Sequence, residues 1–114
     1  MQTKENNVGK GFIIRIIRVD RGFLIAGCDE ELLGKKFTEG KKQIDLTSNF
    51  YKGEKYSDKD HNKVLNLMKN AYIINIVGHR IVDLALKNKI IDSNRVLFIS
   101  GVPTAQSVND NNLT

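Results

Sequence analysis

Four lysines gather in the stretch LGKKFTEGKK: Lys35, Lys36, Lys41 and Lys42. A lysine ammonium group is a compact positive charge that can neutralise a phosphate of a nucleic-acid backbone. The two glycines of the stretch invite comparison with a phosphate-binding P-loop, which has four residues between its glycines and then Lys-Ser or Lys-Thr. Here five residues separate Gly34 from Gly40, and Lys41 precedes another lysine. The stretch is therefore not a P-loop, and its chemistry rests on charge.

Aromatic and basic side chains alternate in the next polar segment, FYKGEKY, which contains Tyr51 and Lys52. Exposed rings beside lysines can stack on bases while the lysines bind phosphates. The structural alternative is that the rings cover the edge of the core and keep only their hydroxyl groups in water. Tyr51 and Lys52 therefore join the four lysines as candidate nucleic-acid-binding residues.

A second group of reactive residue types forms a candidate pocket, provided that the fold brings its members together: Cys28, Asp29, Glu30, His79 and Gln106. A nucleophilic cysteine needs a nearby base and a lowered pKa. A lone cysteine at the end of a strand is more often a small buried apolar residue. The acids also suit the start of a short helical turn, with Asp29 as its N-cap, and this capping interpretation is preferred.

The composition bounds the class of protein. The formal net charge of +5 and the pI of about 9.4 favour acidic partners, with nucleic acid first. A single cysteine allows no internal disulfide and fits a reducing cytoplasm. The polar first residues contain no secretory signal, and charged or polar residues interrupt every long apolar run, so we expect no membrane segment. No cofactor motif and no metal-ligand spacing is present, and we expect neither group.

The first half of the chain predicts strands. The β-branched run FIIRIIRV and the run Phe23–Cys28 flank Asp-Arg-Gly, which predicts a β-hairpin over 12–28. A helical turn follows and ends at Gly34. The alternation around Ile44 and Leu46 predicts a third strand over 43–47.

The second half predicts helices and a last strand. A capping-box pattern that begins at Ser57 starts a helix over 58–70. Apolar residues then recur at helical spacing as far as Leu86, which predicts that 71–86 is also helical, with Gly78 in its interior as a close-packing residue. A buried fourth strand is expected over 95–100, and a turn over 101–106.

Together these elements predict an α+β fold. It is a two-layer sandwich in which a small, mostly antiparallel sheet, made of the N-terminal hairpin and the later strands, is covered by two helices. We expect one domain over 12–107, a flexible lead over 1–11 and a flexible tail over 108–114.

Four blocks of the sequence occur in a recognisable order: CDEELLGKKFTEG (28–40), FYKGE (50–54), NIVGHRIVDLALKNKII (75–91) and VLFISGVPTAQ (96–106). In these blocks the chain resembles the archaeal domain of unknown function 424 family, and CDEELLGK and GVP-x-AQ are the specific parts. The family's last block usually reads GVPHAQ, and Thr104 stands where that histidine would be. The resemblance implies a small α+β domain of an archaeal cytoplasmic protein, with a loose association with translation and no established reaction.

Three functions remain open on these grounds. The leading hypothesis is a non-enzymatic module that binds RNA or a ribonucleoprotein particle through the lysines. The second is a small enzyme or ligand-binding domain that uses the pocket of Cys28, Asp29 and His79. The third is a protein-interaction adaptor that uses an exposed edge of the hairpin.

Overall fold

The computed structural model of the chain describes residues 10–109. Its strands are β1 (Phe12–Val19), β2 (Gly22–Asp29), β3 (Lys36–Glu39), β4 (Lys42–Asp45), β5 (Glu54–Tyr56), β6 (Ile73–Val77), β7 (Val96–Ile99) and β8 (Val102–Val108). Its α-helices are α1 (His61–Lys69) and α2 (His79–Lys87), and short 3-10 turns include η2 (Glu30–Leu32), η3 (Asn49–Tyr51), η4 (Asp58–Asp60) and η5 (Ser93–Arg95). A six-stranded sheet has the order β5-β1-β2-β6-β8-β7, and β3 pairs with β4 in a separate two-stranded sheet.

The β1–β2 hairpin confirms the prediction for 12–28. Its antiparallel register runs from Phe12 opposite Asp29 to Val19 opposite Gly22. The β-branched residues of β1 favour an extended backbone, and Gly22 takes a positive φ of 147° at the turn, which glycine adopts without steric cost.

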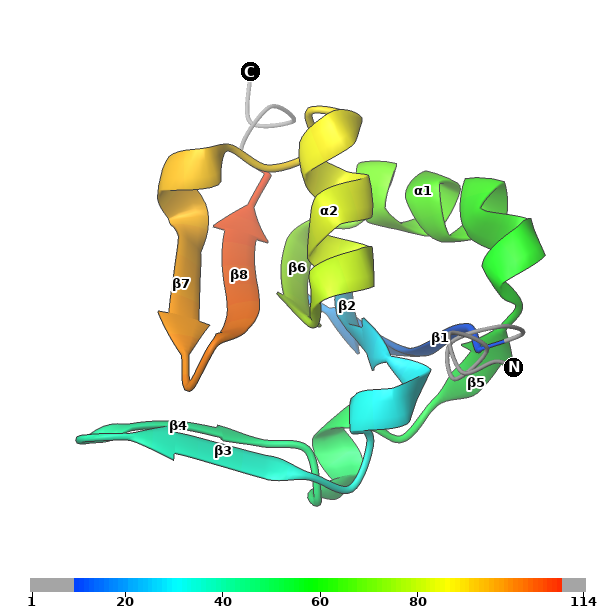
Figure 1. The fold of residues 1–114 in the computed structure, drawn as a ribbon. Helices are drawn as coiled ribbons and strands as arrows, with labels where there is room; N and C mark the ends of the chain where they lie inside the picture. The colour runs from blue at the N-terminus through cyan, green and yellow to red at the C-terminus, as the bar shows by residue number, and fades with distance from the viewer. Residues whose placement is uncertain (1–9, 110–114) are drawn as a thin grey trace.

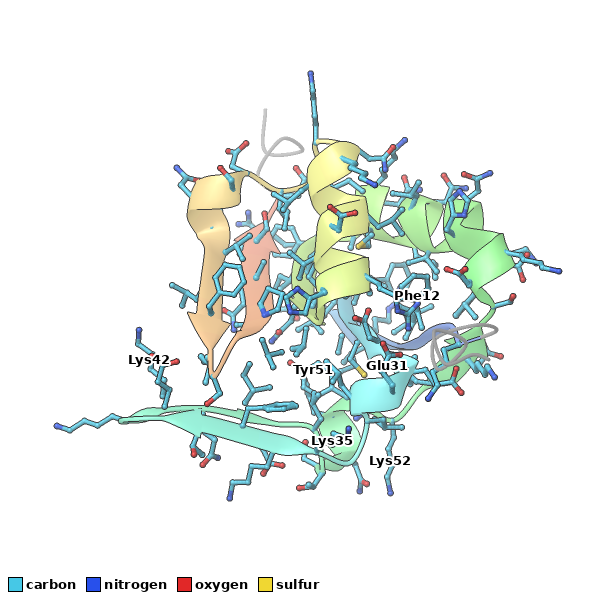
Figure 2. The ribbon with its side chains drawn as sticks, in the orientation of Figure 1. Phe12, Glu31, Lys35, Lys42, Tyr51 and Lys52 are labelled. Carbon is cyan, nitrogen blue, oxygen red and sulfur yellow. The ribbon has the colours of Figure 1, made fainter. Side chains whose placement is uncertain are left out.

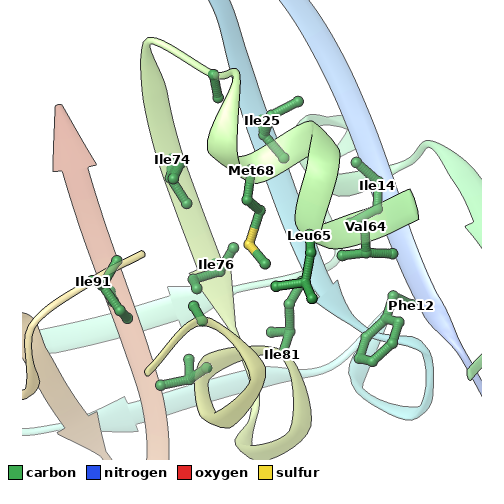
Figure 3. Close-up of a cluster of buried hydrophobic side chains, with 14 residues drawn as sticks. Phe12, Ile14, Ile25, Val64, Leu65, Met68, Ile74, Ile76, Ile81 and Ile91 are labelled. Carbon is green, nitrogen blue, oxygen red and sulfur yellow. The ribbon is translucent and has the colours of Figure 1, made fainter. Parts of the chain in front are cut away.

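Both helices cover one face of the large sheet (Figure 1). The segment that contains α1 crosses over between β2 and β6, which are the parallel pair of the sheet; its other pairs are antiparallel. Between helices and sheet lies a core of buried apolar side chains (Figure 3). It includes Ile14, Ile25, Val64, Met68, Ile76 and Ile81. The predicted α+β fold, with two helices on a mostly antiparallel sheet, is confirmed.

The opposite face of the sheet is covered by the β3–β4 hairpin, which we call the ribbon (residues 36–45), together with η3. This second core contains Cys28, Ile44, Leu46, Tyr51 and Val77. Only the strand over 43–47 was predicted here, and β4 confirms it to within two residues. The ribbon adds a layer under part of the sheet that the sequence prediction lacked (Figure 1).

The prediction of helix over 71–86 was wrong in its first half. Residues Ile73–Val77 form β6, a central strand between β2 and β8. Its sequence, IINIV, is rich in β-branched residues, which suit a strand buried on both faces. A short apolar run has no periodicity that separates strand from helix, and pairing with β2 and β8 decided the outcome. Gly78 is consequently the N-cap of α2, and not an interior helix residue.

The predictions for 95–106 also need correction. Residues 101–106 were expected to form a turn, but only Ser100 and Gly101 turn, and β8 begins at Val102. Pro103 lies one residue beyond the last β6–β8 pair, which is Val77 with Thr104. Proline has no backbone N–H to donate, and at this position the ladder of hydrogen bonds to β6 has already ended, so the strand tolerates it. Strand β7 is not fully buried, since Leu97 is 55% and Phe98 56% exposed. Its position at the edge of the sheet explains this exposure.

Packing extends slightly past both expected domain ends. Gly11 is buried, and its N–H donates to Glu30 Oε1 at 2.8 Å. At the other end β8 continues to Val108, and Asn109 N–H donates to Tyr72 O at 2.7 Å. The rest of the expected flexible lead and tail, residues 1–9 and 110–114, lies outside the described residues. Within 10–109, neither helix is long and apolar enough to cross a membrane.

Candidate nucleic-acid interface and the neighbouring polar cluster

The lysines of the ribbon are all exposed, but they do not form one face. Lys36 lies opposite Asp45 and Lys42 lies opposite Glu39 in the β3–β4 ladder, and these cross-strand pairs partly balance the charge. Lys41 follows Gly40 at the turn, where the backbone has a positive φ of 62°. Figure 2 shows Lys42 and Lys52 leaving this layer in opposite directions. Lys41 and Lys42 therefore lie at the tip of the ribbon, and Lys35 and Lys36 lie at its base.

The ribbon is attached to the turn between β7 and β8. Ser100 N–H donates to Glu39 Oε1 at 2.7 Å, and Ser100 Oγ donates to Thr38 O at 2.5 Å. Ser100 holds a positive φ of 51°, which is uncommon for a residue with a side chain. The attachment places the basic ribbon beside β7, where Phe98 precedes Ser100 by two residues.

The sequence analysis missed Phe98 as an exposed aromatic residue. Its ring centroid lies 6.5 Å from that of His79, at the start of α2, and more than half of the residue is open to solvent. An apolar run such as RVLFIS indicates a buried strand, and the edge position of β7 leaves the consecutive residues Leu97 and Phe98 exposed on its two faces. No signal in the sequence distinguishes this edge from a central strand.

Tyr51 is buried and does not offer its ring to a base. It lies between the ribbon and the sheet (Figure 2), 8% exposed, and its hydroxyl donates to Asn75 Oδ1 at 2.9 Å. Burial raises the pKa of Tyr51 to about 12. Phe50 packs edge-on against it, with ring centroids 4.9 Å apart. Of the two candidates in this segment, Lys52 is exposed and Tyr51 is part of the second core.

Cys28 is fully buried in the same core, among Ile13, Ala26 and Val77. Burial, reinforced by the negative charges of Asp29 and Glu31, raises the pKa of its thiol to about 12. At neutral pH the sulfur is therefore protonated and inaccessible, which is the environment of a structural cysteine.

Asp29 caps a helix, but not the turn that the sequence suggested. Its side chain makes no capping bond to η2. Instead Oδ2 accepts from Arg80 N–H and Oδ1 accepts from Ile81 N–H, each at 2.9 Å, so the carboxyl group satisfies the free N–H groups in the first turn of α2. Asp29 is 2% exposed. Burial raises its pKa, although the two N–H bonds act in the opposite direction.

Arg80 and Glu31 extend this cluster and were absent from the predicted site. Arg80 Nε donates to Glu31 Oε2 at 3.1 Å, and Arg80 Nη2 donates to Glu31 Oε1 and, at 2.9 Å, to Gly11 O. The guanidinium also lies 5.0 Å from the centroid of the Phe12 ring. Every donor named here has a partner within the fold, which favours a structural role for the cluster.

The remaining pocket candidates make their contacts with residues other than Cys28. Glu30 pairs with Lys55 at 3.2 Å, Gln106 is exposed opposite Asn75 on β8, and exposed His79 contacts Gly101 O through Nε2 at 3.1 Å. None of the five residues lines the cavities of about 580, 450 and 390 Å³. Among residues 10–109, no group of three His, Cys, Asp or Glu side chains is placed to hold a metal ion.

Thr104 occupies the position at which the family that this chain resembles usually has histidine. Its hydroxyl donates to Ile76 O at 3.0 Å, across the β6–β8 pair. Thr104 thus makes a bond within the sheet.

Comparison with known proteins identifies a similar fold and the family of the chain. The chain is similar to a crystal structure of an uncharacterized conserved protein from Methanopyrus kandleri, with a TM-score of 0.68 and 20% identity over 84% of this chain and 89% of that one. At this identity the likeness shows the fold alone. No curated protein matches the chain. The sequence profile of the protein of unknown function family DUF424 matches residues 17–109. Because that match spans most of the sequence, the chain belongs to the DUF424 family.

Proposed function

We propose that the chain is a non-enzymatic module that binds single-stranded RNA, free or within a ribonucleoprotein particle. The ribbon and strand β7 form the binding surface. Lys41 and Lys42 contact phosphates at the ribbon tip, and Lys35, Lys36 and Lys52 extend the positive charge along its base. Phe98 takes the stacking role that the sequence analysis assigned to Tyr51.

The observation that carries the proposal is the attachment of the lysine-bearing ribbon to the turn that follows Phe98. Ser100 bonds to Thr38 and Glu39, so the cations of the ribbon lie beside the edge strand that carries Phe98, whose exposed ring is on the α2 side of that strand, near His79. Proteins that bind single strands combine backbone-tracking charge with aromatic stacking, and one stacked base contributes about 1–3 kcal/mol. The net charge of +5 supports the same class of partner. An archaeal, cytoplasmic setting is part of the proposal.

The test is a titration of a fluorescein-labelled single-stranded RNA, followed by anisotropy over about 50–300 mM salt. We expect affinity to fall steeply with salt. The double change Lys41→Ala and Lys42→Ala should reduce the slope of log K against log salt by about 1.4, since each phosphate contact on a single strand contributes about 0.7. Phe98→Ala should weaken binding by at least about fivefold through lost stacking, without a change in that slope.

The matched control changes two lysines on the α1 side of the molecule, Lys59→Ala with Lys69→Ala. It removes the same charge and should leave the slope close to that of the unmodified protein. Equal losses in the two double variants, or affinity that does not depend on salt, would overturn the proposal. A protein partner that is captured from native lysate and is retained after nuclease treatment would favour the adaptor function instead.

A further inference from the structure

An apolar groove lies on the helix-covered side of the sheet. Helix α1 has nine residues and covers Ile14 and Ile25, but it leaves Ile16 45% and Phe23 42% exposed near the hairpin turn. The groove has a volume of about 580 Å³, within the range of roughly 300–1,000 Å³ that is typical of small-molecule sites. Its lining consists of Ile16, Phe23, Ile25, Tyr56, Leu67 and Ala71, with Lys63, Asn66 and Asn70 along the rim.

The polar groups of the rim are gathered on one edge. Lys63 and Asn66 lie on α1, and Asn70 is its C-cap residue. Their spacing of i, i+3 and i+7 places them on one side of the helix. Neither the Lys63 ammonium nor the Asn66 side-chain amide has a hydrogen-bond or ion-pair partner within residues 10–109. Asn70 Nδ2 donates to Asn66 O at 2.9 Å. The edge therefore offers one cation and one open amide to a ligand head group.

The other charges near the groove favour the same sign of ligand. Arg18 lies with its Cζ 5.7 Å from the centroid of the Phe23 ring, on the hairpin side. Glu54 is the carboxylate bonded to a lining residue, and it accepts from the Tyr56 hydroxyl at 3.3 Å, so it is partly engaged. An apolar floor with cations on both sides complements a molecule that has an apolar body and an anionic head.

We propose that this groove binds a small amphiphilic carboxylate. The hydrocarbon body lies on Ile16, Phe23 and Leu67, and the carboxylate accepts hydrogen bonds from Lys63 and the Asn66 amide. The Lys63–Asn66 edge suits one head group, whereas a peptide carries polar backbone groups along its whole length. This ligand site lies on the sheet face opposite the ribbon and goes beyond the proposed RNA-binding function.

The test uses decanoate as the probe, below its micellar concentration, with binding followed by amide chemical shifts of the isotope-labelled protein. We expect saturable shifts at the hairpin end of β1 and β2 and along α1. Two matched compounds separate the contribution of the hydrocarbon chain to binding from that of the carboxylate. Decyltrimethylammonium keeps the chain and reverses the charge, and acetate keeps the carboxylate alone. The ammonium compound should bind at least about tenfold more weakly, because it loses charged hydrogen bonds at the rim, and acetate should produce no saturable shift.

Variants of exposed residues test the head-group contact without disturbing the core. Lys63→Glu should weaken decanoate binding by at least about tenfold. Lys69→Glu, the same change on the same helix but away from this groove, should stay within about twofold. Phe23→Ser should weaken the binding of both alkyl compounds to the same extent, since it removes part of the apolar floor that both contact.

Several outcomes would overturn the proposal. One is equal binding of decanoate and its ammonium counterpart, and another is no effect of Lys63→Glu. Shifts at Ile16 and Phe23 that depend on protein concentration alone would assign the groove to a second copy of the chain. Nuclear Overhauser contacts between the Phe23 ring and residues 1–9 or 110–114 would assign it to a terminus of the same chain.

Discussion

Asp29 and Gly78 occupy adjoining space at the start of α2. A Cβ atom on residue 78 would lie 2.4 Å from Asp29 Oδ2, closer than any real contact, and Gly78 has a positive φ of 123°. The carboxyl group that caps α2 therefore requires glycine at the position before the helix, for both space and backbone conformation. Two of the family-like blocks, CDEELLGK and NIVGHRIVDLALK, meet in this contact.

At this scale we predict that Gly78→Ala destabilises the fold by at least about 2–3 kcal/mol, because it adds a steric conflict to the cost of a positive φ. Gly34→Ala is the control, since Gly34 has a similar φ of 88° but no atom within 4 Å of an added Cβ. It should cost only about 1–2 kcal/mol. Urea unfolding of both variants measures the difference, and equal losses would show that the Asp29 contact is unimportant.

The Glu31–Arg80 pair predicts a dependence of stability on pH. Burial acts to raise the pKa of Glu31, but the bonds from Arg80 outweigh it and hold the pKa below the ordinary value of 4.5. The folded state therefore favours the carboxylate, and this stabilisation is present above pH 4.5 and is lost as the pH falls through the folded-state pKa. The pKa of Asp29 is raised in the folded state, so Asp29 changes the stability with pH in the opposite direction.

We accordingly expect Glu31→Gln to lower the urea midpoint at pH 7, and the difference from the unmodified protein to shrink as the pH falls below 4.5. Asp83→Asn is the control, because Asp83 forms an exposed pair with Lys87 that contributes little. A difference that does not change with pH would contradict the assigned role of the Glu31 carboxylate.

At the scale of elements, the ribbon is a small two-stranded sheet that depends on its attachments. A two-stranded hairpin is marginally stable in water by itself. Phe37 and Ile44 face each other across the ribbon and contribute to the second core, while Glu39 and Thr38 bond to Ser100. The stability of the ribbon therefore depends on these contacts with the rest of the fold.

We predict that Glu39→Ala speeds amide hydrogen exchange in residues 36–45 by roughly fivefold, the effect of about 1 kcal/mol for one hydrogen bond. Exchange in β6 should not change, since that strand has no contact with Glu39 among the hydrogen bonds of the fold. Glu54→Ala is a control that removes an exposed acid from β5 instead. Faster exchange across the whole sheet would mean that the ribbon unfolds only with the entire domain.

At the scale of the whole molecule, the large sheet separates two cores. Neighbouring residues of one strand belong to different cores: Ile76 packs under the helices and Val77 under the ribbon. The alternation of a strand sends successive side chains to opposite faces. Cys28 lies in the ribbon-side core, so access to its thiol requires the ribbon layer to open or the domain to unfold.

We predict that Cys28 resists a thiol reagent such as dithiobis-nitrobenzoate in the native protein at pH 8, because the thiol is buried and its pKa is about 12. Labelling should follow unfolding as urea is added. Glu39→Ala provides a matched comparison: faster labelling in this variant would place the access route at the ribbon. Rapid labelling of the unmodified native protein would instead restore Cys28 as a candidate nucleophile.

The sequence determined the local features of this protein. The β-branched hairpin of 12–28 and the exposure of the four lysines follow from residue preference and charge, which act over a few positions. A helix follows Ser57 as expected, although Ser57 caps the short turn η4 and α1 begins only at His61. The four ordered blocks identified the family in the same way, because they are properties of the sequence itself.

Tertiary structure alone decided the rest, for one physical reason: burial depends on residues that are distant in the chain. Pairing with β2 and β8 made Ile73–Val77 a strand, and the edge of the sheet exposed Phe98. Asp29 caps a helix that begins fifty residues later, which no local pattern encodes. The candidate lysines and the burial of Cys28 were thus anticipated from the sequence, but the exposed ring of Phe98 and the groove beside α1 emerged only from packing.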